Sequence, residues 1–399
     1  MKPKRLARDS RHITVAAIGL MLVACGSEAP ATGNTAIAAG AAVAQAPITG
    51  AQAFAEKPFV ATPIATFQSP WALAFLPDGR MLVTEKAGTM LLVSADGKTR
   101  VALAGIPAVD SDKQGALGEV ALDPDFAGNK LVYFSFSEAA GEEKGIALVR
   151  GRLAEDGAGG ARLDDVRILY RAHPKVTGGG HYAGRIAFSS DGHLFFSAGE
   201  RQKFDPAQDP RATLGKVLRL DPDGRPAEGN PLAAEGFDPA VWSYGHRNPL
   251  GLAFDGQGRL WEVEMGARGG DELNLVLPGR NYGWPLVSNG DHYDGKVIPD
   301  HPTRPDLEAP KTSWNPSISP SSLLFYSGTM FPEWRGNAFI SALSGQALLR
   351  IAIDGDTARE AARYAMNARI RAVDQGPDGA LYVLEDGPDG RLLRLTPKQ

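Results

Sequence analysis

The sequence predicts an all-β protein, a six-bladed β-propeller made of four-stranded antiparallel blades. Three observations lead to this prediction. From about residue 59 onward, short β-type runs are found and no helical period is sustained. The 399 residues include 47 glycines and 29 prolines, so the chain turns often. One unit also recurs six times: an apolar strand, a turn containing Gly with Asp or Asn, and a second apolar strand.

The six units are spaced irregularly along the chain. Their first strands are expected at residues 73–75, 120–122, 185–188, 250–254, 323–326 and 370–373, and a third strand follows each unit, at residues 90–93, 147–150, 216–220, 272–276, 348–353 and 392–395. A sheet this small cannot cover both of its faces, whereas radial packing of six sheets does so and leaves only short edges. A pair of β-sandwiches is the alternative, but no segment resembles a linker between two halves.

The first 24 residues have the pattern of a secretory signal peptide. A basic head precedes an apolar run, Ile13 to Ala24, that is too short to span a bilayer comfortably. The run ends in Leu-Val-Ala-Cys-Gly, which resembles a bacterial lipobox in which Cys25 is lipidated and becomes the new N-terminus. An ordinary cleaved signal with an incidental cysteine is the alternative. Gly26 favours, by the same resemblance, anchoring on the periplasmic side of the outer membrane, with a soluble periplasmic protein as the alternative.

These boundaries give the expected domain organisation. Residues 1–24 form a lipoprotein signal peptide, 25–58 a flexible tether and 59–399 the propeller domain. Residues 26–57 are rich in Ala, Gly, Thr and Pro and have few large apolar side chains, so they cannot bury enough surface to fold. The lipid at Cys25 would be the sole membrane attachment.

The charge balance excludes some classes of function. The chain has 42 basic and 46 acidic side chains, and removing the five basic residues and one acid of residues 1–24 leaves 37 and 45. The resulting net charge of −8 argues against a general nucleic-acid binder. The single cysteine excludes an intramolecular disulfide and a multi-cysteine zinc site.

Four residues are candidates for binding an anion at one mouth of the propeller, where function is usually located in loops. Arg247 and Asn248 lie together in the segment Tyr-Gly-His-Arg-Asn-Pro. Arg369 and Arg371 would lie on one face of an extended segment, because side chains alternate along a strand. The three arginines could converge on a small polyanionic ligand. Surface arginines paired with Asp or Glu are the alternative.

A glycine run, Gly178 to Gly180, precedes the candidate base, His181. Such a run lets the backbone approach a ligand closely, and the histidine would lie just before an inner strand, at a channel mouth. A neutral imidazole there could act as a general base, with a purely structural role as the alternative. A dinucleotide-binding fingerprint is a poor alternative, because the glycine spacing is off by one residue and no helix follows.

Three further features are expected near the same mouth. Residues 264–274 combine flexible backbone with the adjacent carboxylates of Asp271 and Glu272, and calcium takes carbonyl and carboxylate oxygens in such loops. A turn with solvated acids is the alternative. Gln114 lies just before the inner strand of the second unit. Trp314, before the fifth unit, could stack on a flat ligand or pack in the core.

Taken in order, these segments resemble the soluble quinoprotein glucose/sorbosone dehydrogenase family, specifically its aldose sugar dehydrogenases that use pyrroloquinoline quinone (PQQ). The resemblance runs from about residue 59 to 397, and its most specific segments are residues 114–126 (QGALGEVALDPDF), 181–199, 245–251 (GHRNPLG), 266–285 (GARGGDELNLVLPGRNYGWP) and 369–384. It implies a six-bladed propeller that oxidises the C1 hydroxyl of an aldose to a lactone by hydride transfer to calcium-bound PQQ. An external electron acceptor, a cytochrome or a quinone, is the implied partner.

The resemblance also implies roles for individual residues. His181 would remove the proton from the sugar C1 hydroxyl, and Gln114 would lie over the cofactor near the sugar. The residues implied to contact PQQ are Arg247, Asn248, Arg369, Arg371 and Trp314, the last of these lining the ring. The carbonyls of Gly266 and Ala267 would hold the calcium that bridges PQQ to the protein, and Asp271 would support that loop and pair near His181. A second, structural calcium is implied at Glu272 and the carbonyl of Tyr282.

Three departures from the family's pattern bear on the substrate. Ala267 stands where relatives usually carry proline, which keeps a carbonyl ligand but loosens the loop. Ser344 stands where some relatives have a lysine that contacts PQQ. Gly180 and Arg201 stand where glucose-specific members carry an acid and a glutamine that contact the sugar. We therefore expect PQQ to be retained and the substrate range to differ from that of the glucose enzymes.

Two other functions remain open from the sequence. A non-catalytic envelope propeller could bind a glycan or a protein partner; the retained His181 and arginines argue against it, whereas Ala267 and Ser344 favour it. A metal-dependent lactonase would need calcium held by several side-chain carboxylates and amides at the axis, and no such set can be assigned.

Overall fold

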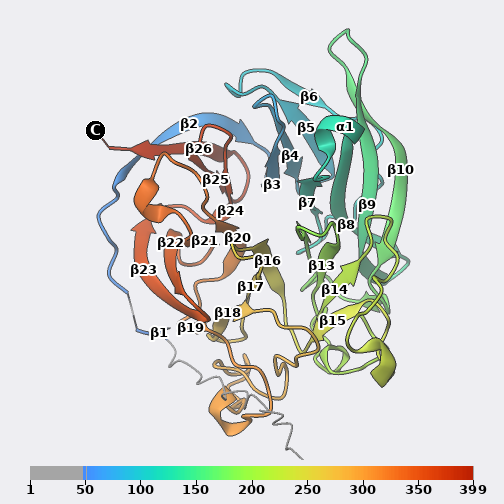
Figure 1. Cartoon of the computed structure of the whole chain (residues 1–399), viewed down its shortest axis with the longest axis vertical. Helices are drawn as coiled ribbons and strands as arrows, with labels where there is room; N and C mark the ends of the chain where they lie inside the picture. Colours follow the sequence, from blue (N-terminus) through green and yellow to red (C-terminus); the bar gives the residue numbers. More distant parts are fainter. Residues whose placement is uncertain (1–47, 51, 399) are drawn as a thin grey trace, which may run out of the picture. The chain divides into compact units, whose positions relative to one another are not determined.

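The described part of the chain forms a six-bladed β-propeller, which confirms the predicted fold class (Figure 1). The structure, a computed structural model, describes residues 48–50 and 52–398. Each predicted unit supplies the two innermost strands of one blade, and the strand that follows it is the third. Every innermost strand contacts the innermost strand of the next blade, and the last contacts the first, so the ring is closed.

Blades 1 to 3 are antiparallel sheets in which each strand pairs with the next one along the chain. Blade 1 consists of β3 (Pro70–Phe75), β4 (Met81–Glu85), β5 (Thr89–Val93) and β6 (Arg100–Ala102). Blade 2 consists of β7 (Leu117–Leu122), β8 (Leu131–Ala140), β9 (Glu143–Glu155) and β10 (Ala161–Arg171), and β11 (Val176–Thr177) also pairs with β9. Blade 3 consists of β12 (Ala183–Phe188), β13 (Leu194–Ala198), β14 (Lys216–Leu220) and β15 (Val241–Tyr244).

Blades 4 to 6 complete the ring. Blade 4 consists of β16 (Pro249–Phe254), β17 (Leu260–Glu264), β18 (Asp271–Leu275) and β19 (Thr312–Asn315). Blade 5 consists of β20 (Pro320–Phe325), β21 (Ala338–Ala342), β22 (Ala347–Asp354) and β23 (Thr357–Ala365). Blade 6 consists of β24 (Ile370–Gln375), β25 (Leu381–Glu385), β26 (Gly390–Pro397) and β2 (Phe59–Phe67). Since β2 precedes blade 1 in the chain and pairs with β26, blade 6 joins the two ends of the propeller.

Helical structure in the described residues is confined to short turns in the connections. These are α1 (Phe126–Asn129) and the 3-10 turns η1 (Asp205–Ala207), η2 (Ala233–Glu235), η3 (His301–Thr303) and η4 (Pro332–Trp334). Within the described ranges, no helix has the length and apolar character needed to cross a membrane.

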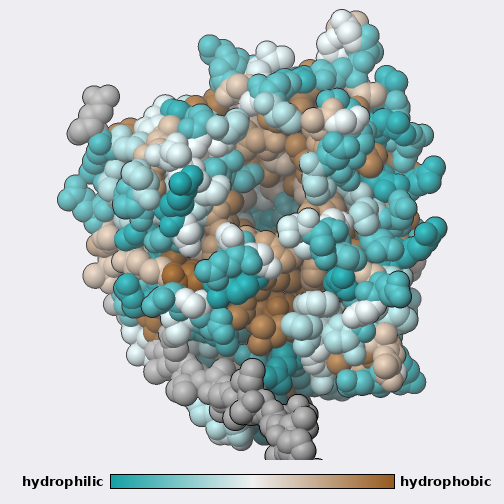
Figure 2. Space-filling model, in the orientation of Figure 1, coloured by the Kyte–Doolittle hydropathy of each residue, from teal (hydrophilic) through white to brown (hydrophobic). Residues whose placement is uncertain are grey.

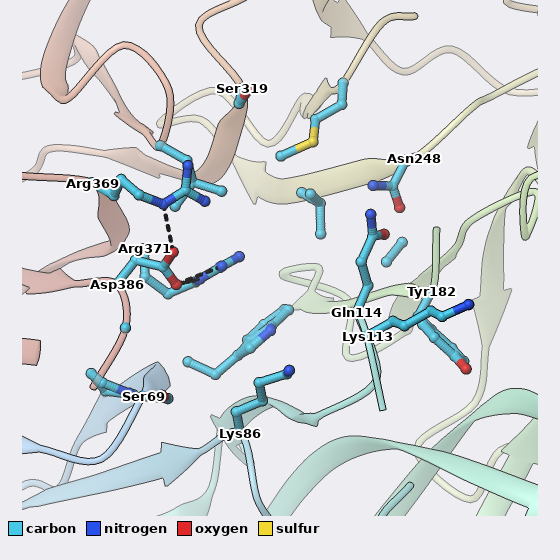
Figure 3. Close-up of a pocket in the computed structure, with 17 residues that line it drawn as sticks. Ser69, Lys86, Lys113, Gln114, Tyr182, Asn248, Ser319, Arg369, Arg371 and Asp386 are labelled. Carbon is cyan, nitrogen blue, oxygen red and sulfur yellow. Dashed lines mark hydrogen bonds and ion pairs between the residues drawn. The ribbon is translucent and has the colours of Figure 1, made fainter. Parts of the chain in front are cut away.

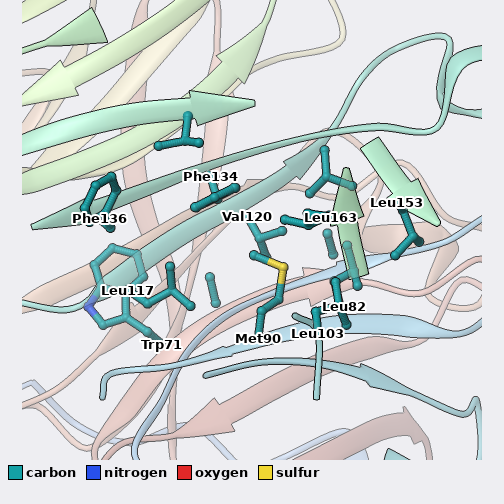
Figure 4. Packing of buried hydrophobic residues seen from close by; sticks show 14 of the residues in the cluster. Trp71, Leu82, Met90, Leu103, Leu117, Val120, Phe134, Phe136, Leu153 and Leu163 are labelled. Atoms are coloured by element: carbon teal, nitrogen blue, oxygen red, sulfur yellow. The ribbon is translucent and has the colours of Figure 1, made fainter. Parts of the chain in front are cut away.

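A hydrophobic cluster fills each interface between neighbouring blades. Figure 4 shows the cluster between blades 1 and 2, in which Leu82 and Met90 belong to the same packed group as Leu117 and Phe134. Five corresponding clusters lie at the other interfaces of the described ring. Truncating a buried leucine in such a cluster costs about 2–5 kcal/mol, so these interfaces fix the position of each blade and of its mouth loops.

All six innermost strands share a register shift near their first residues. Such a bulge re-aims the residue that it inserts. In β12 this residue is Arg185, which donates hydrogen bonds to the Leu250 carbonyl at 2.5 Å, to the Glu119 carboxylate at 2.5 Å and to the Ser321 carbonyl. Its guanidinium lies 4.1 Å from the centre of the Trp71 ring. Arg185 therefore connects five blades inside the channel, whose hollow is seen in Figure 2.

The prediction that residues 25–58 form a flexible tether is wrong for part of its C-terminal end. Ile48 and Thr49 form β1 (Ile48–Thr49), which pairs in parallel with β19, and Ala55 makes a bridge to Tyr364. The outer edge of blade 4 has free backbone groups that accept this segment, and Ile48 packs on the cluster between blades 4 and 5. The predicted signal peptide, Cys25 and the rest of the tether lie outside the described residues.

Candidate active site

A cavity of about 490 Å³ opens at the mouth where the innermost strands begin (Figure 3). This volume suits a small-molecule ligand. Its lining comes from all six blades, from mouth loops and from the first residues of innermost strands, and includes Trp71, Lys86, Lys113, Gln114, Tyr182, Asn248, Ser319, Arg369, Arg371 and Asp386. The structure therefore brings together four residues selected from the sequence: Gln114, Asn248, Arg369 and Arg371.

The two arginines of blade 6 share one carboxylate. Asp386 accepts from Arg369 Nε at 2.8 Å and from Arg371 Nε and Nη2 at 2.9 and 2.6 Å (Figure 3). Burial opposes ionisation of Asp386, but the two guanidinium groups hold its pKa below the ordinary value. Asp386 thus holds both guanidinium groups in position. The three side chains together keep a net charge of +1 at the cavity wall.

Trp71 forms an aromatic surface of this cavity. The Arg185 guanidinium lies 4.1 Å from the centre of its ring, and that of Arg371 lies 6.0 Å from it. Trp71 is itself the bulge residue of β3, which explains why it faces the channel.

Trp314, in contrast, does not line the cavity, so its expected role at the cofactor ring is wrong. Its side chain is buried in the cluster between blades 4 and 5, and its Nε1 donates to Glu360 at 2.7 Å. Trp314 lies in β19, the outermost of the four strands of blade 4, and is not among the residues that line the cavity. The alternative reading, packing in the core, is the correct one.

The candidate base is held by a carboxylate that the sequence did not single out. His181 Nδ1 is hydrogen-bonded to Glu200, and its backbone N–H donates to Gln114 Oε1 at 2.7 Å. Glu200 also accepts from the backbone N–H groups of Lys203 and Phe204, at 2.5 and 2.7 Å. The bond at Nδ1 fixes the ring and leaves Nε2 without a hydrogen bond to the described residues.

The electrostatic surroundings favour a neutral His181. Burial lowers the pKa of His181, the charges of Arg247 and Arg201 lower it further, and the hydrogen bond to Glu200 opposes them. For Glu200, burial is outweighed by His181 and the backbone donors, so its pKa lies below the ordinary value. A neutral imidazole beside a carboxylate that can stabilise the imidazolium is the arrangement of a general base.

The glycine run leaves room for side chains of the protein itself, at Gly179 and Gly180. A Cβ at Gly180 would clash with the Gln202 amide, and one at Gly179 with Lys113. Arg201 is 1% exposed and donates to the carbonyls of Gly180 and Gly178 at 2.8 and 2.6 Å. Arg201 therefore braces the loop that carries His181, and it is buried away from any substrate.

Arg247 and Asn248 lie in a turn that hydrogen bonds to Glu264 and Met265 hold in place. Glu264 accepts from their backbone N–H groups at 2.5 and 3.1 Å, and Arg247 Nη1 donates to the Met265 carbonyl at 2.9 Å. Arg247 Nε and Asn248 Oδ1 are buried and have no hydrogen-bond partner among the described residues. Such unpaired buried atoms beside a cavity indicate a ligand.

A fully buried histidine completes the support of this turn. The His246 Nδ1 atom lies 3.4 Å from Glu262 and 3.5 Å from Glu264, and Ser243 is 2.9 Å from its Nε2. Burial opposes protonation, but the two carboxylates raise the pKa of His246 to about 9. The imidazolium offsets part of the negative charge beneath the turn.

The predicted calcium loop has carbonyls available for a cation. Asp271 accepts from the Gly266 N–H at 2.9 Å, which supports the loop as expected. Its other oxygen accepts from Ser317, Ile318 and Ser319 at 2.6–2.7 Å. The expected pairing of Asp271 near His181 is wrong, since Glu200 occupies that place. The carbonyls of Gly266 and Ala267 accept no hydrogen bond from the described residues.

Glu272 and Tyr282, the pair expected at a second calcium, line one small cavity of about 10 Å³, together with Glu264 and Gly270. This is roughly the space of a single water-sized sphere. Glu272 is also 3.1 Å from Nε2 of the buried His301. Ser344 is neutral and bonds to Ser319 at 2.8 Å, so blade 5 adds no cation at this position.

Sequence reasoning missed Glu200, Asp386 and Trp71. Glu200 follows β13 and Asp386 follows β25, so both lie where second strands end at this mouth. A search for acids immediately after second strands would have found them. Trp71 has no comparable signal, because the bulge that turns it toward the channel is seen only in the pairing of β3 with β4.

The chain matches the family model described as "Glucose / Sorbosone dehydrogenase" over residues 67–394. It is 39% identical to aldose sugar dehydrogenase YliI of Escherichia coli, over 82% of this chain and 90% of that protein. The crystal structure of the E. coli soluble aldose sugar dehydrogenase in the apo-form superposes with a TM-score of 0.81, at 37% identity, over 85% of this chain and all of that one.

The PQQ-bound aldose sugar dehydrogenase of Streptomyces coelicolor gives a TM-score of 0.69, at 30% identity, over 87% of this chain and all of that one. These matches confirm the resemblance stated from the motifs. The chain belongs to the glucose/sorbosone dehydrogenase family.

Proposed function

We propose that this protein is a PQQ- and calcium-dependent dehydrogenase that oxidises the C1 hydroxyl of an aldose to a lactone and passes the electrons to an external acceptor. One observation carries the proposal: Arg369 and Arg371 form a cationic wall of the cavity, and Gln114 in the same lining accepts from the backbone N–H of the carboxylate-supported His181. Family membership and the PQQ-bound relative support the choice of cofactor and of a sugar substrate.

The residues present fit PQQ. PQQ is a planar aromatic molecule with three carboxylates, and the cavity offers Arg369, Arg371, an unpaired Asn248 oxygen and the flat ring of Trp71. An arginine-rich cavity on an otherwise acidic chain attracts such an anion. When bound, PQQ supplies the quinone that accepts hydride from the sugar C1 carbon.

The chain's own groups handle the proton and the orientation of the sugar. His181 Nε2 takes the proton of the C1 hydroxyl, and Glu200 stabilises the resulting imidazolium through Nδ1. Gln114 holds the His181 backbone and lines the cavity, so it couples the position of the base to that of the sugar. Arg201 keeps the loop of the base rigid from beneath.

Calcium also fits the loop after β17. The carbonyls of Gly266 and Ala267 would hold it, with Asp271 keeping the loop in shape through the Gly266 N–H. A bound calcium would polarise a ligand oxygen and offset the negative charge of the cofactor. Glu272 and the Tyr282 carbonyl would hold a second ion in the small cavity beside them.

The same proposal extends to location and partners. Cys25 carries a lipid and anchors the propeller on the periplasmic side of the outer membrane, and a cytochrome or a quinone takes the electrons. Loss of incorporated radiolabelled palmitate in a Cys25→Ala variant, with release into the soluble periplasmic fraction, tests the anchor. Unchanged labelling in that variant contradicts it.

Reconstitution tests the function. Apo-protein is mixed with PQQ and calcium, and dye reduction is measured with a panel of aldoses. Turnover that requires both PQQ and calcium is expected. Binding of PQQ without turnover of any aldose contradicts the enzymatic proposal and favours a binding propeller, and absence of PQQ binding contradicts the cofactor.

A further inference from the structure

The cavity carries more positive charge than its arginine pair supplies. Among the described residues that line it, the charged side chains are Lys86, Lys113, Arg369, Arg371 and Asp386, which gives a formal charge of +3 at neutral pH. Asp386 is taken up by the two arginines. Neither lysine has a carboxylate oxygen within 4.0 Å among the described residues.

Lys86 is the lysine whose side chain enters the cavity. It follows β4 in blade 1, where its N–H donates to the Ser69 carbonyl at 2.9 Å and its carbonyl accepts from the Leu117 N–H at 3.1 Å. Its backbone is therefore fixed on both sides. In Figure 3 the Lys86 ammonium is directed toward the middle of the cavity, whereas Lys113 runs along the edge beside Tyr182. Lys86 is half-buried and Lys113 is exposed.

This placement is unfavourable for the protein alone. The Lys86 side chain has no carboxylate partner among the described residues, and the positive wall of Arg369 and Arg371 lines the same cavity and repels its ammonium. Lys98, at the other end of the same blade, shows the ordinary situation: it lies 3.3 Å from Asp96 and its side chain is 83% exposed. A cation without a carboxylate partner, on a fixed backbone and in a cationic cavity, indicates an anionic ligand that neutralises it.

We propose that Lys86 binds a carboxylate of the cofactor, as an anchor separate from Arg369 and Arg371. The inference rests on the proposed function, because that function supplies a planar aromatic tricarboxylate. Blade 6 contributes the arginine pair and blade 1 contributes Lys86, so carboxylates at two positions on the ring are held by two different blades. Two separate anchors fix the rotation of a flat ligand in its own plane, and this rotation sets its reactive edge relative to His181.

The experiment measures ligand binding to the apo-protein, with calcium present, by isothermal titration calorimetry at low and high salt. The variants are Lys86→Gln, Lys86→Arg and, as the matched control on the same blade, Lys98→Gln. Lys86→Gln is expected to weaken PQQ binding about tenfold and to make the affinity less sensitive to salt. Lys86→Arg keeps most of the affinity, and Lys98→Gln leaves it unchanged. Thermal unfolding of each apo-variant checks the fold, and Lys86→Gln should be at least as stable as the wild type.

Failure of this inference is distinguishable from failure of the proposed function. If the wild type binds PQQ and Lys86→Gln binds equally well at both salt concentrations, the inference is overturned and the function stands. If the wild type does not bind PQQ, the function fails, and the same titration with benzene-1,3,5-tricarboxylate then decides on Lys86. Loss of that binding in Lys86→Gln supports a carboxylate anchor, and equal or absent binding in the wild type and Lys86→Gln overturns it.

Discussion

The two ends of the propeller channel share the same six innermost strands but differ in charge. The cavity at the end where these strands begin holds about 490 Å³ and carries the charge of +3 described above. The cavity at the other end holds about 380 Å³ and is lined mainly by strand residues, with Glu119, Asp374 and Arg185 as its charged groups among the described residues. Its formal charge is −1, so an anion is favoured at one end alone.

The difference teaches where function is built on this scaffold. The second cavity is bordered by strand backbone and apolar side chains, which the hairpin pattern requires for packing. The first is bordered mainly by loop residues, which are free of that requirement, together with the first residues of innermost strands, such as Trp71 and Arg371. Arg185 lines the second cavity and contacts Trp71, which lines the first. This one side chain therefore lies between the two cavities.

The largest expected effect is the loss of the base at the loop end. Replacing His181 by Ala should lower kcat by about 10²–10⁴, because the variant loses the imidazole that is assigned to take the hydroxyl proton. The PQQ affinity should be nearly unchanged. Steady-state kinetics and a PQQ titration check both parts. A variant that keeps the wild-type kcat contradicts the assignment of the base.

The next largest effect is expected at Glu200, the carboxylate that bonds to His181. Glu200→Gln should lower kcat by roughly 10², because the imidazolium loses its stabilising charge. It should also move the acid limb of the pH profile. Burial lowers the pKa of His181 and Glu200 opposes this, so without the carboxylate the pKa falls further and the acid limb of kcat/KM moves to lower pH.

A pH profile of kcat/KM for wild type and Glu200→Gln provides the measurement, with Glu200→Asp as the variant that keeps the charge. A limb that moves to higher pH in Glu200→Gln contradicts the assigned interaction. A loss of activity with no movement of the limb indicates a merely structural role for Glu200.

The arginine pair should affect binding more than chemistry. Arg371→Ala should weaken PQQ binding by about 10- to 100-fold, because it removes a charged hydrogen-bond donor and leaves Asp386 facing the ligand. Arg369 is half exposed, and its removal should cost less. Calorimetry gives both affinities, with Arg359→Ala on the exposed side of blade 5 as the control. Unchanged affinity in both pocket variants would rule out this wall as the carboxylate site.

The smallest effect is expected at the opposite end. Burial raises the pKa of Asp374 to about 7, and Glu119 adds to this. Its folded pKa thus exceeds the unfolded value near 3.9, so the folded state binds the extra proton and stability falls as the pH rises from about 4 through 7. Asp374→Asn should leave activity intact and raise Tm at pH 8 but not at pH 4. A loss of PQQ binding in this variant would show that the two ends are not separate.

Much of the fold could be predicted because the signals are local. Each hairpin turn and its flanking apolar strands lie close together in the chain, so six units were visible without any knowledge of their packing. The closure of blade 6 could not be predicted in this way, because β2 and β26 pair across more than 300 residues of chain. The parallel pairing of Ile48 with Trp314 was hidden for the same reason.

The site residues that lie in continuous sequence motifs could be predicted. Those whose role depends on a partner far away in the chain could not. Gln114, Asn248, Arg369 and Arg371 stand out in short segments, and they meet at one cavity. Glu200 and Asp386 depend on which strand ends lie together, which only the fold decides. The prediction for Trp314 was wrong because the sequence before the fifth unit does not show that this residue belongs to the outermost strand of blade 4.

The most direct test is a calorimetric titration of the apo-protein with PQQ in the presence of calcium, comparing wild type, Arg371→Ala and Asp374→Asn. Saturable binding of one PQQ per chain is predicted for the wild type and Asp374→Asn, with the affinity weakened in Arg371→Ala. No binding to the wild type, or binding that survives Arg371→Ala and is lost in Asp374→Asn, would contradict a cofactor site at the loop end of the channel.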